Sequence, residues 1–108
     1  MTNYYHIRMD DLSEYCDTNK IIEFLNENNK FSYNGNGAFN CKNEYCLITL
    51  VYSNNFNSFS SPNDFNNCRT NYIDIITSYE ISNELMKLLQ KLAYYLKTEL
   101  VEEEYKWY

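Results

Sequence analysis

Residues 45–53, YCLITLVYS, combine aliphatic, β-branched and aromatic side chains and carry no charge. This composition predicts a β-strand. Apolar residues fill consecutive positions in the middle of the segment instead of alternating, which is typical of a strand covered on both faces. We therefore expect this strand near the centre of a sheet.

Two other segments alternate between apolar and polar residues, as half-buried strands do. They are residues 4–9, YYHIRM, and residues 71–78, NYIDIITS. In the first, Tyr5, Ile7 and Met9 share one face. Because a helix is expected directly after this strand, we expect the strand to pair in the middle of the sheet.

A hairpin turn and a short terminal segment complete the expected sheet. Asn34-Gly35 and Asn36-Gly37 lie between short aromatic stretches, which is a strong signal for a tight hairpin turn. Residues 99–102, ELVE, are a candidate for a short edge strand that folds back on the sheet.

Two amphipathic helices are expected. The first begins at Asp17 or Thr18, whose side-chain oxygens can accept from the first-turn amides, and ends in the asparagine-rich residues 26–29. The second is capped by Ser82 and runs from residue 83 to about residue 97. The apolar positions are Ile21, Ile22, Phe24 and Leu25 in the first helix and Leu85, Leu88, Leu89, Leu92 and Leu96 in the second.

These elements predict an α+β fold in the order β-α-β-β-β-α, with or without a final strand. We expect a mostly antiparallel sheet of four to five strands with two helices on one face. A chain of 108 residues with 2 glycines and 1 proline fits a single globular domain over residues 1–108.

The charge balance narrows the classes of partner. The formal net charge is −6 and the isoelectric point is about 4.6. Nucleic acids and anionic membranes attract clustered lysine and arginine, so we expect neither as a direct partner. The first ten residues lack the features of a signal peptide, and no apolar run approaches the roughly 20 residues of a membrane span, so we expect a cytoplasmic protein.

The residues that most often bind metals or cofactors are sparse. Of the 4 cysteines, Cys41 and Cys46 form one loosely spaced pair, while Cys16 and Cys68 lie elsewhere. We expect reduced thiols with no metal and no cofactor; a zinc site and a disulfide are the alternatives. His6 is the one histidine and leaves little freedom to build a catalytic triad.

Carboxylates crowd the chain in two places, residues 10–17 and residues 99–104. Paired carboxylates can catalyse the hydrolysis of glycosidic bonds, but that mechanism needs a deep cleft that a small domain seldom has. The alternatives are a solvated acidic face and a docking face. We expect no enzymatic turnover.

The C-terminal stretch TELVEEEYKWY, residues 98–108, mixes acidic and aromatic residues in the way a surface that binds a basic protein does. The alternative is that Tyr105 and Trp107 only pin the tail to the sheet while the glutamates stay in water. The long connection over residues 54–69 carries three phenylalanines that a solvated loop would not need. The candidate partner-binding residues are Asp10, Asp11, Glu14, Phe56, Phe59, Asp64, Glu102, Glu103, Glu104 and Trp107.

In its overall character, a small acidic α+β chain with a terminal LKTELVEEE, the sequence resembles the immunity proteins of contact-dependent inhibition and related polymorphic toxin systems. The resemblance implies a non-enzymatic protein that binds and neutralises a cognate toxin domain, often a basic nuclease, by covering its active or substrate-binding surface. Two alternatives remain: a phage-type inhibitor or nucleic-acid mimic that binds a host nucleic-acid-processing protein, and a small carboxylate-dependent hydrolase.

Overall fold

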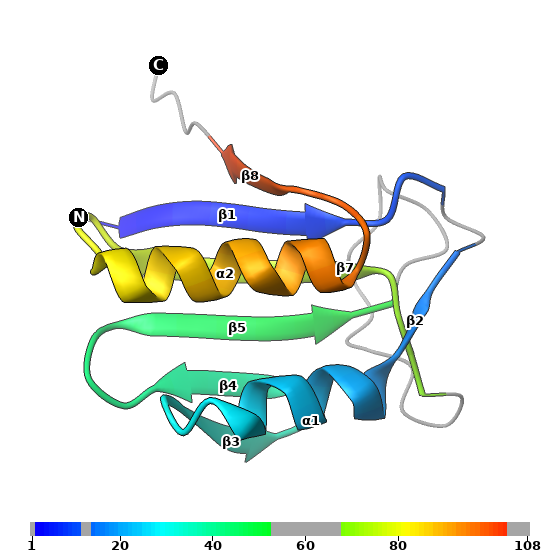
Figure 1. The fold of residues 1–108 in the computed structure, drawn as a ribbon, viewed down its shortest axis with the longest axis horizontal. Helices are drawn as coiled ribbons and strands as arrows, with labels where there is room; N and C mark the ends of the chain where they lie inside the picture. Colours follow the sequence, from blue (N-terminus) through cyan, green and yellow to red (C-terminus); the bar gives the residue numbers. More distant parts are fainter. Residues whose placement is uncertain (1, 12–13, 53–67, 104–108) are drawn as a thin grey trace.

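The computed structural model of the chain describes residues 2–11, 14–52 and 68–103. Within these residues the backbone forms a six-stranded antiparallel sheet in the order β3-β4-β5-β7-β1-β8 and a separate two-stranded ribbon (Figure 1). The strands of the sheet are β1 (Thr2–Arg8), β3 (Phe31–Gly35), β4 (Ala38–Cys41), β5 (Cys46–Val51), β7 (Tyr72–Ser78) and β8 (Leu100–Glu103). The ribbon pairs β2 (Cys16–Asp17) with β6 (Arg69–Thr70), and the helices are α1 (Thr18–Glu27) and α2 (Asn83–Tyr95).

The predicted α+β class and antiparallel sheet are confirmed, but the predicted strand count is too low. The main sheet has one strand more than expected in the described residues, because both flanks of the turn at Asn36 form strands, β3 and β4. The ribbon of β2 and β6 was not predicted either. Strands of two residues are too short to show any periodicity in the sequence.

Strand β5 is central in the sheet, as the composition of this part of the chain predicted, but the two described helices cover one of its faces, whereas cover on both faces was expected. Strand β5 pairs with β4 on one side and with β7 on the other. Cys46, Ile48 and Leu50 are buried beneath the helices, whereas Leu47 and Thr49 on the opposite face are half-buried. Strand β1 is also interior, since it lies between β7 and β8.

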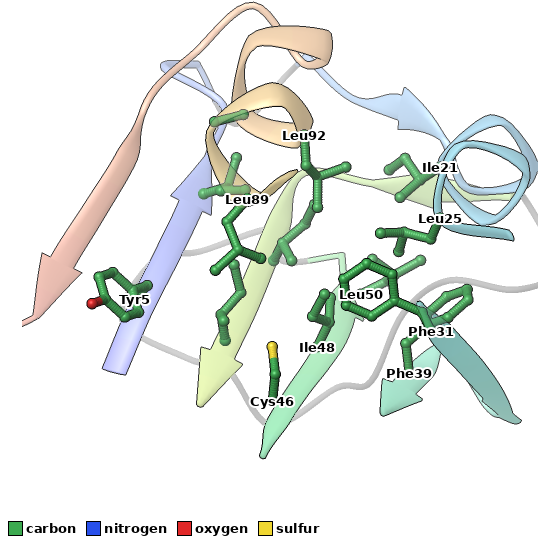
Figure 2. Packing of buried hydrophobic residues seen from close by; sticks show 14 of the residues in the cluster. Tyr5, Ile21, Leu25, Phe31, Phe39, Cys46, Ile48, Leu50, Leu89 and Leu92 are labelled. Carbon is green, nitrogen blue, oxygen red and sulfur yellow. The ribbon is translucent and has the colours of Figure 1, made fainter. Parts of the chain in front are cut away.

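Helices α1 and α2 lie on the same face of the sheet, as expected (Figure 1). Leu89 and Leu92 point from α2 toward the sheet, and Ile21 and Leu25 point from α1 toward the aromatic rings of the β3–β4 hairpin (Figure 2). These four side chains are at most 2% exposed. The burial of these apolar surfaces is the main force that holds the two layers together.

The helix starts follow the capping residues seen in the sequence. The carboxylate of Asp17 accepts from the amide of Asn19, and the hydroxyl of Ser82 accepts from the amide of Leu85 at 3.1 Å. Helix α2 ends at Tyr95, two residues before the predicted end at Lys97. It ends there because Lys97 has a left-handed backbone with φ 59°, after which the chain turns toward β8.

Candidate functional site

A hollow of about 870 Å³ lies at the C-terminal end of α2. Asp10, from the connection after β1, faces it on one side. Its full lining is Asp10, Phe24, Lys91, Tyr94, Tyr95, Lys97, Thr98 and Glu99.

Two smaller hollows adjoin it. One, of about 520 Å³, shares Tyr95 and Lys97 with it and extends to Glu14 and Tyr15. The other, of about 470 Å³, shares Tyr94, Thr98 and Glu99 with it and extends to Glu102 on β8. We call these adjoining hollows the tyrosine groove; its principal residues are Asp10, Glu14, Tyr15, Tyr94, Tyr95, Lys97, Glu99 and Glu102.

The walls of the tyrosine groove are fixed by contacts between distant segments. The hydroxyl of Thr98 donates to the carbonyl oxygen of Arg8 at 2.9 Å, which ties the α2–β8 connection to the end of β1. The ring of Phe24 on α1 stacks on the ring of Tyr95, with 5.1 Å between the centroids. Tyr94 has no such cover: it is 84% exposed, against 41% for Tyr95.

An intramolecular cation–π stack stands at the Glu14 end of the groove. The guanidinium carbon of Arg69 lies 4.2 Å from the centroid of the Tyr52 ring and 5.6 Å from that of Tyr15. Both distances are within the range in which a cation is attracted to a ring face. The stack positions Tyr15 and shows that a tyrosine of this surface already binds a guanidinium.

The groove is acidic on balance. Its charged lining residues are the carboxylates Asp10, Glu14, Glu99 and Glu102 and the lysines Lys91 and Lys97. Tyrosine rings between carboxylates can bind the aliphatic stem and the charged head of lysine or arginine. The arrangement therefore suits a positively charged protein segment.

The structure brings together only part of the predicted binding set. Asp10, Glu14 and Glu102 line the groove, although they come from different segments. Asp11 is exposed beside it, and its carbonyl oxygen accepts from the amide of Glu14. Phe56, Phe59, Asp64, Glu104 and Trp107 lie outside the described residues.

Glu103 lies apart from the groove, on the opposite face of the sheet. One carboxylate oxygen, Oε1, is 2.7 Å from Nδ1 of His6 and accepts from the hydroxyl of Tyr72 at 3.2 Å. The rings of His6 and Tyr72 stack with centroids 5.5 Å apart. Burial, and next the charge of Glu103, raises the pKa of Tyr72. This cluster joins β8 to β1 and β7, which is a structural role.

Sequence reasoning missed the groove tyrosines. Tyr94 falls outside the leucine spacing of α2, so its exposure was readable from the helical period. Tyr95 lies three residues after Leu92 and seven after Leu88, within that spacing, so the period gave no signal for its exposure. Tyr15 carried no such signal, because its position depends on Arg69 in the distant β6. Glu99 was noted within the acidic cluster but was left out of the predicted binding set.

Within residues 2–11, 14–52 and 68–103, no three His, Cys, Asp or Glu side chains are placed to hold a metal ion together. No helix in the same ranges is long and apolar enough to cross a membrane.

Comparison of the chain with protein-family models, with curated proteins and with solved structures found no match.

Proposed function

We propose that the chain is an immunity-type inhibitor, which binds and neutralises a basic bacterial toxin domain through the tyrosine groove. A nuclease is the favoured target, because nucleases carry positive surfaces for their polyanionic substrates. The observation that carries the proposal is the convergence of Asp10, Glu14 and Glu102, from separate segments, on one groove with exposed tyrosines.

The groove has the composition of a protein-binding surface. Tyrosine is enriched at interface hot spots, since its ring supplies contact area at a low entropic cost. The hollows adjoin and are together larger than a single side chain needs, which favours a peptide segment as occupant. The carboxylates, and the net charge of −6, would attract a basic partner and speed its association.

An inhibitor that acts by covering the surface of the toxin needs no catalytic group with a shifted pKa. A bound inhibitor needs only to occupy the positive surface that the substrate would use. As part of this proposal we place the chain in the cytoplasm, because an immunity protein meets the toxin there after the toxin has entered the cell.

The test is co-expression of the chain with the C-terminal domain of the protein encoded by the neighbouring gene. We expect that domain to arrest the growth of a bacterial host, the chain to restore growth, and the two to copurify. A control chain, Glu27→Lys, changes an exposed carboxylate on α1 outside the groove and should protect fully. Glu102→Lys should protect poorly.

Two results would overturn the proposal. One is a neighbouring gene product that is harmless, or toxic and not relieved by the chain. The other is hydrolysis of a nucleotide, glycan or peptide by the chain itself, lost in Asp10→Asn or Glu14→Gln, which would establish the hydrolase alternative. Copurification with a host nucleic-acid-processing protein instead would favour the mimic.

A further inference from the structure

Cys41 ends β4 and Cys46 begins β5, so the two cysteines flank the loop that joins these strands. The pairing of these strands runs from Ala38 with Thr49 to Asn40 with Leu47. The next pair in the same antiparallel register is Cys41 with Cys46. The connecting loop is residues 42–45.

The two thiols also lie on the same side of the sheet. Cys46 is 2% exposed and belongs to the core under the helices, and Cys41 is half-buried and packs against that core. Burial, then the neighbouring Cys41, then Glu44 raises the pKa of Cys46 to about 12.

This geometry fits a disulfide. Directly opposed residues in an antiparallel pair have Cα atoms about 4.5–5.5 Å apart, and disulfides span about 4.4–6.8 Å. The other two cysteines, also within the described residues, are less favourably placed. Cys16 is opposite Thr70 in the β2–β6 ribbon, so Cys68 is a diagonal neighbour, for which about 7–8 Å is typical.

We propose that Cys41 and Cys46 form a dithiol site that closes reversibly to a disulfide, with a low-molecular-weight disulfide as the oxidant. The thiolate of the more accessible Cys41 attacks one sulfur of the oxidant and releases one thiolate. Cys46 then loses its proton and attacks the sulfur of Cys41, releasing the second. Two protein thiols and one disulfide become one protein disulfide and two small thiols, with two electrons passing to the oxidant.

The structure also indicates what the bond would affect. Residues 42–45 include Glu44, whose carboxylate accepts from the amide of Ser82 at 2.9 Å and from its hydroxyl at 2.6 Å. A Cys41–Cys46 bond would close this loop and fix the strand ends that carry it. The bond would therefore affect the N-terminal end of α2, which is the opposite end of the helix from the tyrosine groove. For this reason the inference does not depend on the proposed function.

The test is exposure of the folded, reduced chain to oxidised glutathione, followed by a thiol count and peptide mapping. We expect two of the 4 thiols to disappear, a linked peptide pair containing Cys41 and Cys46, and full recovery of the thiols with a dithiol reductant. Cys41→Ser should abolish formation of the bond. Cys16→Ser and Cys68→Ser are the controls and should each still lose two thiols.

The proposal is overturned if all thiols persist, if glutathione stays attached to Cys41, or if the linked peptides contain Cys16 and Cys68. Cys46 is in the core, so Cys46→Ala is a second variant to be used only after its fold has been checked by circular dichroism. If that variant does not fold, the peptide map of the wild-type chain decides alone.

Discussion

Asp74 is a partly desolvated carboxylate on the polar face of the sheet. It is half-buried, opposite His6 on β1 and Thr49 on β5. Burial, and next the charge of Glu103, raises its pKa above the ordinary 3.8, while His6 acts in the opposite direction. A carboxyl group with a raised folded-state pKa favours folding below its unfolded pKa, and this contribution is lost as the pH rises through the folded value. At neutral pH the ionised group therefore opposes folding.

We predict that Asp74→Asn increases the free energy of unfolding at pH 8, and increases it less or not at all at pH 3, where the native carboxyl is protonated. Urea denaturation at the two pH values measures both. Glu27→Gln, which removes an exposed carboxylate of α1, is the control and should change neither value appreciably. A larger gain at pH 3 than at pH 8 would contradict the assigned direction of the pKa shift.

Individual residues show how far the sequence could be used for prediction. The alternation in β1 correctly separated Tyr5 and Ile7 from His6. It contained no information on the partner of His6, because Glu103 is 97 residues away and reaches it through the pairing of β8 with β1. The hydrophobic period of a strand or helix indicates on which face of that element a side chain lies. The residues that the side chain contacts depend on how the strands are ordered in the sheet.

Among the elements, α2 contributes most of the helical side of the core. Leu85, Leu89, Leu92 and Leu96 are buried, and Leu88 at the side of the stripe is half-buried. We predict that Leu89→Ala lowers the free energy of unfolding by about 2–5 kcal/mol, since it leaves a cavity in a site with no exposure. Leu88→Ala should cost distinctly less. Chemical denaturation gives both values, and a loss below about 0.5 kcal/mol for Leu89→Ala would mean that the stripe is not a core element.

A second prediction concerns the N-terminal cap of α2. Ser82 caps the helix, and the carboxylate of Glu44 in turn accepts from Ser82. We expect Ser82→Ala and Glu44→Ala each to cost about 1 kcal/mol. The double variant should cost less than the sum of the two, because the residues act in one network. Strict additivity in a double-mutant cycle would show that Glu44 stabilises the chain independently of the cap.

The elements also show where prediction from sequence ends. Ser82 was recognised as a cap, since residues of this type precede helices, but Glu44 was not, because it lies on a loop 38 residues away. The end of α2 was placed two residues too late, as Lys97 adopts a left-handed backbone that usually favours glycine or asparagine. Strong periodic patterns predicted element type well, and backbone turns at single residues were missed.

At the level of the whole molecule, the sheet order creates the candidate site. Pairing of β8 with β1, together with the Thr98–Arg8 hydrogen bond, places Glu99 and Glu102 on the same side of the molecule as Asp10. The α+β class and the helices on one face followed from composition and period. The groove itself did not, because its walls come from residues that are distant in sequence.

The charge of the groove leads to a prediction about association. Binding of the proposed toxin domain should weaken as salt rises, since screening reduces long-range attraction. Glu102→Lys should mainly slow association, by about tenfold or more at low salt, with a smaller effect on dissociation. Glu27→Lys, with the same change of charge outside the groove, is the control. Stopped-flow mixing at two salt concentrations measures these rates, and equal slowing by the two variants would point to net charge alone.

The most direct test of the groove as the binding surface is a calorimetric titration of the proposed toxin domain with Tyr94→Ala and Tyr79→Ala. Both tyrosines are well exposed, at 84% and 60%, but Tyr79 lies at the opposite end of α2 from the groove. If the groove binds the toxin, Tyr94→Ala weakens the complex about tenfold or more, as loss of an interface anchor does, and Tyr79→Ala binds like the wild type. Unchanged affinity for Tyr94→Ala, or an equal loss for both variants, would contradict the assignment.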